Sequence, residues 1–355
     1  MSQFFYGVIE GFYGRQWSWR VRQDYAPFLA KAGFDCYIFA PKGEPLLRSH
    51  WRQPLGEVTC RHLQLLAESY RLSGLRWGLG LSPLGLSAGY SAEDARQLER
   101  KVVEINTLSP DILCILFDDM RGDIPALAER QVQIVDTVLQ HSTARQHIVC
   151  PTYYSFDPVL EEVFGTMPGD YWQELGDGMP GEVGVFWTGN RVISPAVTPT
   201  DIRQAAAALG RKPVLWDNYP VNDGRKTCSH LHLRPYQGRS SELAVLTSGH
   251  LVNPMNQPWL SRLVLQSLQA LYGEGEGYST DKAWQRALAM LGDESLARQL
   301  DGDLKRFQDG GLENMSAQTR SMLSDCYSRF VHPAAAEVVD WLGGGYDFDP
   351  ACLTG

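Results

Sequence analysis

Short runs of apolar, β-branched and aromatic residues recur along the chain, with longer stretches between them. Several of the short runs are continuously apolar rather than alternating, which is typical of strands that are covered on both faces. We expect eight strands: FFYGVIEGF (4–12), DCYIFAP (35–41), RWGLGLSP (76–83), DILCILFDD (111–119), HIVCPTYY (147–154), EVGVFWTG (182–189), PVLWDN (213–218) and LAVLTSG (243–249).

In the stretches between these runs, apolar residues return every three or four positions and glycine often follows, which predicts amphipathic helices. The clearest lie at 22–34, 60–74, 92–108, 124–141, 199–210 and 257–273, and the link over 155–181 is more irregular. Eight strand–helix units in series predict an α/β fold of the (β/α)₈ TIM-barrel type, with the helices outside. An open doubly wound sheet is the main rival, but no G-x-G-x-x-G motif follows the first strand to support a dinucleotide fold.

The polar, glycine-rich stretch GEGEGYST (273–280) reads as a boundary. We therefore expect a barrel domain over residues 1–272 and a helical C-terminal region over 281–355. This region is expected to be a cap or small domain, and its alternative role is an oligomer contact; the oligomeric state stays open.

Charge and cysteine content narrow the class of protein. The formal net charge is −9 and no basic run stands out, so we expect neither a nucleic-acid partner nor binding to anionic membranes. No apolar segment approaches the roughly 20 residues that span a bilayer, and the N-terminal residues show no signal-peptide pattern. The seven cysteines are scattered, with no C-x-x-C spacing. These features predict a cytoplasmic protein. We expect no cofactor.

Polar and aromatic residues follow the predicted strands at their C-terminal ends, where barrel enzymes carry their chemistry. This set comprises Glu10 to Arg15, Pro41-Lys42, Asp118-Asp119, Thr152 to Tyr154, Trp187, Trp216 to Asn218 and Asn253-Pro254. Such a rim suits a neutral, polyhydroxylated ligand, because aromatic faces cover C–H groups while short polar side chains bind hydroxyls. Each residue also has a structural interpretation: core packing for a tryptophan or tyrosine, a solvated end for Lys42, and a turn for Asn253.

The adjacent carboxylates of Asp118 and Asp119 directly follow an apolar run, although burying two like charges is costly. Asp119 as a helix cap and the pair as a Mg²⁺ or Mn²⁺ site are alternatives. We favour acid–base chemistry, because neighbouring carboxylates push their pKa values apart. Adjacent residues on a strand point to different sides, however, so they are unlike the acid and nucleophile of an ordinary glycosidase. The pair suits a sugar whose own N-acetyl oxygen attacks, with one aspartate holding the amide N–H and the other protonating the leaving oxygen.

One further cluster, CSHLHL, places Cys228, His230 and His232 on one face of an extended segment. Zinc binding is one interpretation. Without a fourth ligand, we favour a polar loop face.

Eight segments in order resemble the catalytic domain of glycoside hydrolase family 84: GVIEGFYGRQWSW, YIFAPKGEPLLRSHWR, ILFDDM, CPTYY, VFWTG, LWDNYPVND, RPYQGR and LVNPMNQP. The family contains O-GlcNAcases and β-N-acetylglucosaminidases, some described as hyaluronidases. The resemblance covers residues 1 to about 272. It implies a (β/α)₈ fold and a retaining, exo-acting hydrolase of N-acetylglucosamine-containing glycoconjugates or oligosaccharides that works through an oxazoline without a metal.

The resemblance also implies roles for single residues. Asp118 would orient the acetamido N–H, and Asp119 would be the general acid and then the general base. The sugar would be bound by Gly11, Lys42, Tyr154, Trp216, Asn218, Asp223 and Asn253.

The chain departs from the family pattern at Gly43, Glu44, Tyr153 and Arg234. We expect these departures in loops next to the sugar, and they leave Asp118 and Asp119 in place. Two alternatives to the hydrolase are a non-catalytic N-acetylglucosamine-binding protein and a hydrolase that uses a divalent metal.

Overall fold

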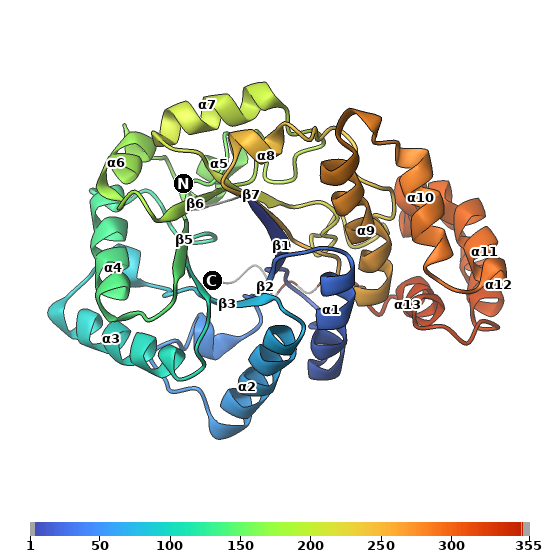
Figure 1. Ribbon diagram of the computed structural model, residues 1–355, viewed down its shortest axis with the longest axis horizontal. Coiled ribbons are helices and arrows are strands. Elements are labelled where there is room, and N and C mark those ends of the chain that lie inside the picture. Colours follow the sequence, from blue (N-terminus) through green and yellow to red (C-terminus); the bar gives the residue numbers. More distant parts are fainter. Residues whose placement is uncertain (1–3, 349, 351–355) are drawn as a thin grey trace.

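Eight parallel strands pair in chain order and close into a barrel in the computed structural model, which describes residues 4–348 and Pro350 (Figure 1). The strands are β1 (Phe5–Glu10), β2 (Cys36–Phe39), β3 (Arg76–Leu81), β4 (Ile112–Leu116), β5 (Gln146–Cys150), β6 (Gly184–Trp187), β7 (Val214–Asp217) and β8 (Gly249–Val252). Closure comes from β8 and β1, which pair from Phe5 opposite Gly249 to Val8 opposite Val252. The predicted barrel is confirmed, and the open sheet is not formed.

The eighth strand does not lie where its sequence pattern places it. Within 243–249, residues Leu243–Leu246 form the short helix α8, and the strand is the next segment, Gly249–Val252. Its polar residue His250 is completely buried, because Tyr272 and Asp217 hydrogen-bond its two ring nitrogens, at 2.7 and 3.2 Å. A strand carrying a glycine and a paired histidine looks less apolar than the helix that precedes it, which explains the error.

Helices surround the barrel, and each strand is followed by at least one (Figure 1). They are α1 (Trp19–Lys31), α2 (Glu57–Leu72), α3 (Ala92–Asn106), α4 (Leu127–His141), α5 (Val159–Phe164), α6 (Tyr171–Gly178), α7 (Pro199–Leu209), α8 and α9 (Pro258–Glu274). The irregular link 155–181 contains α5 and α6. Capping boxes start α3 and α7, where Ser91 and Thr198 exchange hydrogen bonds with an aspartate three residues on.

The barrel core explains the continuously apolar strand patterns. Every residue of β2, β4, β7 and β8 is buried, because each strand faces the barrel interior on one side and helices on the other. Polar side chains that a ligand could reach are therefore expected at the C-terminal ends of the strands and in the loops that follow.

Within residues 280–348, the C-terminal region contains four α-helices and lies beside α9 (Figure 1). They are α10 (Thr280–Ala289), α11 (Glu294–Lys305), α12 (Ala317–Tyr327) and α13 (Pro333–Leu342). A second hydrophobic cluster joins them to α9 and to barrel loops, through residues such as Leu231 and Met255. The division into two domains stays a prediction. No helix in residues 4–348 is both long and apolar enough to cross a bilayer.

Candidate active site

A cavity that is open to solvent, with about 550 Å³ of empty space, lies at the C-terminal ends of the strands. The structure brings all nine sequence-predicted site residues to its wall: Gly11, Lys42, Asp118, Asp119, Tyr154, Trp216, Asn218, Asp223 and Asn253. They come from six strand ends, so only barrel closure brings them together. Their roles in binding or catalysis stay predictions at this point.

Asp118 is almost completely buried and pairs with one cation. Its Oδ2 contacts the ammonium of Lys42, which follows β2 and is equally buried. Its Oδ1 is buried as well, and no described residue donates a hydrogen bond to it. Burial raises the pKa of Asp118; the Lys42 ammonium opposes this shift, and Asp119 adds to it. One carboxylate oxygen is therefore free to accept a hydrogen bond from a ligand in the cavity.

Asp119 has a more open environment than its neighbour. Its backbone adopts a left-handed conformation with φ of 58°, which aspartate tolerates better than most residues, and its side chain is 26% exposed. Tyr13 donates a hydrogen bond to Oδ2, and the Tyr154 hydroxyl lies 3.5 Å from Oδ1. The Lys42 ammonium is 3.6 Å from Oδ2. Asp119 is thus held at the cavity mouth while remaining accessible.

Asp223 provides a third carboxylate in the cavity, from the loop after β7. Its Oδ2 accepts a hydrogen bond of 2.7 Å from the Tyr13 backbone N–H. Burial raises the pKa of Asp223 to about 6, although this N–H favours the charged form. An acceptor with this pKa can bind sugar hydroxyls as a carboxylate at neutral pH.

Two asparagines link the ends of β1, β7 and β8. Asn253 accepts from the Gly11 N–H at 3.2 Å and donates to Asn218 Oδ1 at 3.0 Å. The same Asn218 oxygen accepts from the Trp216 indole at 3.0 Å, and its amide donates to the Val192 carbonyl at 2.8 Å. Asn218 therefore fixes the Trp216 ring and the loop after β6. Gly11 must lack a side chain, because a Cβ there would lie 2.4 Å from Trp216.

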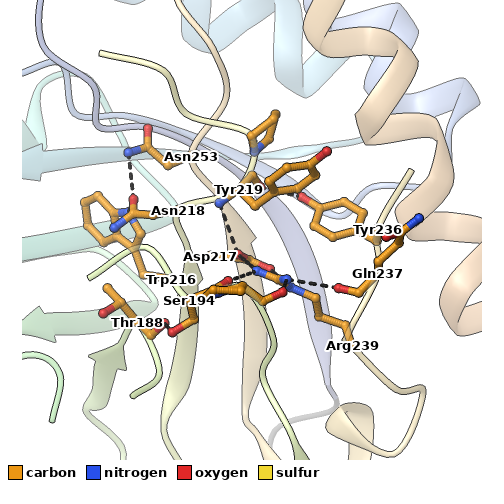
Figure 2. A network of polar contacts seen from close by, with 12 residues as sticks. Thr188, Ser194, Trp216, Asp217, Asn218, Tyr219, Tyr236, Gln237, Arg239 and Asn253 are labelled. Carbon is orange, nitrogen blue, oxygen red and sulfur yellow. Dashed lines mark hydrogen bonds and ion pairs between the residues drawn. The ribbon is translucent and has the colours of Figure 1, made fainter. Parts of the chain in front are cut away.

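A buried ion network lies behind this wall (Figure 2). Asp217 ends β7 and accepts two hydrogen bonds from Arg239, at 2.9 and 2.7 Å. Arg239 also donates to the backbone carbonyls of Ser194, Pro195 and Gln237. Although burial opposes ionisation, Arg239 and His250 hold the pKa of Asp217 well below its usual range. The network ties the loops after β6 and β7 together and thereby supports Trp216 and Asn218.

Several residues of the predicted rim do not line the cavity, and three of them have clear structural partners. Glu10 is buried against Arg22 and Tyr37, Trp187 packs edge-on against Phe156 and Trp172, and Tyr153 donates to the Gly165 carbonyl at 2.5 Å. For these residues the structural interpretation is correct.

The four departures from the family pattern also lie outside the cavity wall. Glu44 accepts from the Leu46 N–H at 3.1 Å, and Gly43 lies beside Gln16. Arg234 pairs with Asp309, with Nη2 to Oδ2 at 2.7 Å. Glu44, Tyr153 and Arg234 therefore have structural partners.

Sequence reasoning missed several residues of the wall. They are Tyr13, Cys150, Thr188, Val192, Ile193 and Val221. Tyr13 follows the first strand, in a segment that the sequence does place at the rim. Its aromatic hydroxyl, two residues after Gly11, is the feature that could have identified it as a wall residue. The others lie in irregular loops or look like core residues.

The zinc interpretation of Cys228, His230 and His232 is not supported. Within residues 4–348, no three potential metal ligands are grouped to hold an ion. His230 and His232 instead bond backbone carbonyls through Nδ1, at 3.0 Å to Gln308 and Pro220 respectively. At the Asp118–Asp119 pair, the Lys42 ammonium contacts both carboxylates.

The sequence and the fold are similar to those of known proteins. A family model described as beta-N-acetylglucosaminidase matches residues 6–308. Protein O-GlcNAcases from Rattus norvegicus and Mus musculus are each 29% identical over 262 residues, which cover 71% of this chain. The match spans only 28% of the length of those relatives.

A solved structure is similar over nearly the whole chain. It is a mutant of the Thermobaculum terrenum O-GlcNAc hydrolase, with a TM-score of 0.78 and 28% identity over 97% of this chain and 81% of that one. The chain therefore belongs to the beta-N-acetylglucosaminidase family, glycoside hydrolase family 84.

Proposed function

We propose that the protein is a retaining exo-β-N-acetylglucosaminidase, which removes terminal β-linked N-acetylglucosamine from glycoconjugates or oligosaccharides. The observation that carries the proposal is the buried Oδ1 of Asp118, to which no described residue donates a hydrogen bond, beside the accessible carboxyl of Asp119. The first can accept the acetamido N–H, and the second can exchange a proton with the glycosidic oxygen. Names of the relatives, O-GlcNAcase and O-GlcNAc hydrolase, support this substrate class.

In the proposed reaction, the acetamido oxygen attacks C1 of its own sugar as the bond from C1 to the aglycone oxygen breaks. Asp119 gives its proton to the departing oxygen, and Asp118 holds the N–H so that the carbonyl oxygen points at C1. The intermediate is an oxazoline that is protonated on nitrogen, with its N–H still hydrogen-bonded to Asp118. Water then attacks C1, the bond from C1 to the acetamido oxygen breaks to restore the acetamido group, and the water loses a proton to Asp119. Two inversions leave the released sugar in the β configuration. Tyr13 and Tyr154 would keep the Asp119 carboxyl in line with the leaving oxygen.

The remaining wall residues fit a single terminal sugar. Asp223 and Asn253 offer acceptors and donors to ring hydroxyls, and Trp216 offers an aromatic face near the acetamido group. Asn218, whose polar atoms already have protein partners, would hold Trp216 in place.

The test replaces the acetyl group of an aryl N-acetylglucosaminide by trifluoroacetyl, which makes the attacking oxygen electron-poor. We expect kcat/KM to fall by about 10³-fold or more, because the nucleophile belongs to the substrate. Comparable rates for the two substrates would disprove substrate assistance. Absence of aryl release from either would favour a non-catalytic binding protein, and loss of activity in a chelator would favour a metal hydrolase.

A further inference from the structure

Helix α2 carries a line of apolar side chains on its outer face. Val58, Leu65 and Leu72 are 70%, 43% and 82% exposed, respectively. Because their spacing is close to two complete helical turns, the three side chains lie on one face, along about 21 Å of the helix. Among the described residues, no other helix has more than one large apolar side chain that is exposed. Single exposed apolar residues are ordinary, whereas such a line marks a contact surface.

Charged residues complete the same face of α2. Arg61 and Glu68 alternate with the apolar residues along the line, and Glu57 and Arg71 lie beside it, near its two ends. All four residues are exposed, and none of them forms an ion pair with another described residue. The face therefore combines apolar positions with charges of both signs that are free to bind an oppositely charged surface.

This face is complementary to itself when a second copy of α2 runs antiparallel to the first. With the two Leu65 side chains on a twofold axis, Val58 of one copy faces Leu72 of the other. Arg61 of one copy then lies within one residue of the position opposite Glu68 of the other, and the axis repeats each of these contacts. A parallel arrangement would instead place Arg61 against Arg61 and Glu68 against Glu68, which is unfavourable.

We propose that α2 is the contact between two copies of this chain, in an antiparallel twofold dimer with Leu65 at the axis. Glu57 and Arg71 add an ion pair near each end of the contact. Helix α2 lies on the outside of the barrel, away from the C-terminal helices (Figure 1), so a second copy can approach it without meeting that region.

The size of the contact sets its expected strength. A pair of helices of this length buries less than the roughly 1,200 Å² at which stable interfaces begin, so the dimer should be weak, with a Kd of about 10–100 µM. Sedimentation velocity of the full chain over a range of concentrations measures this equilibrium. Wild type should pass from monomer to dimer as its concentration rises through the Kd.

Substitutions on α2 test the position and the direction of the contact. Leu65→Glu should raise the Kd at least about tenfold, since it brings two like charges together at the axis. The matched control is Val103→Glu on α3, where the side chain is 52% exposed, and it should leave the Kd unchanged. Arg61→Glu and Glu68→Arg should each raise the Kd about tenfold, because like charges then meet twice. The double variant Arg61→Glu/Glu68→Arg restores both pairs with reversed polarity and should recover the wild-type Kd.

Three outcomes would overturn the inference. The first is a chain that stays monomeric at every attainable concentration. The second is a dimer that Leu65→Glu leaves intact and Met322→Glu, on α12 of the C-terminal region, dissociates. The third is a double variant no tighter than the two single charge reversals, which would exclude the antiparallel arrangement. Far-UV circular dichroism shows that each variant is folded. Because no described residue of the cavity wall belongs to α2, these outcomes leave the proposed function to its own test.

Discussion

Asp118 and Asp119 are consecutive in the chain, yet their carboxylates have different surroundings. Asp118 is buried against Lys42, and the left-handed turn at Asp119 directs the second carboxyl to the cavity mouth. Burial raises the pKa of Asp118, and the nearby charge of Asp119 raises it further, while Lys42 opposes this shift. The sequence predicts that the two groups differ, because adjacent residues cannot share one environment. It does not predict Tyr13, whose hydroxyl holds Asp119 from across the barrel.

At this scale we predict the effect of Asp119→Asn. Phenyl N-acetylglucosaminide, with a poor leaving group, should lose about 10²- to 10⁴-fold in kcat, because its oxygen requires a proton. The 2,4-dinitrophenyl analogue should lose far less. Asp118→Asn is the matched neighbour, and it should slow both substrates alike because it does not deliver a proton. Equal losses for both substrates in Asp119→Asn would remove Asp119 from the acid role.

At the scale of elements, the barrel strands follow from the sequence and the loops do not. Apolar runs identify seven strands. A strand that is buried on both faces consists of apolar neighbours, and such a run can be recognised without knowing the rest of the fold. The eighth strand is missed because His250 is made acceptable in the core by Asp217 and Tyr272. Such partners, distant in the chain, also explain why no role is predicted for Arg239, although the segment RPYQGR, which resembles the family pattern, includes it.

The Asp217–Arg239 pair gives the prediction at this scale. Arg239→Met should lower the free energy of unfolding by about 3–5 kcal/mol, since it leaves Asp217 charged and buried without its partner. Arg234→Met, which removes a more exposed pair with Asp309, should cost no more than about 1 kcal/mol. Urea denaturation measures both. A similar small cost for the two variants would show that the network does not stabilise the loops behind Trp216.

At the scale of the whole molecule, one carboxylate connects the C-terminal helices to the barrel. Glu337 of α13 accepts hydrogen bonds of 2.9 Å from the backbone N–H groups of Trp259 and Leu260, at the start of α9. Helix α9 follows the loop that contains Asn253, a residue of the cavity wall. By binding the start of α9, α13 supports this side of the barrel. Burial raises the pKa of Glu337 to about 8, although the two N–H groups and Arg262 favour its charged form.

This pKa predicts how stability changes with pH. Between about 4.5, the ordinary glutamate value, and about 8, the folded chain keeps a proton that the unfolded chain has lost. The contribution of Glu337 to the free energy of unfolding should therefore fall as pH rises through this window. Glu337→Gln has no such titration, so wild type should lose stability relative to this variant between pH 5 and pH 8.5. Parallel pH profiles for wild type and Glu337→Gln would mean that Glu337 is charged in the folded protein and that α13 binds α9 as an ionised cap.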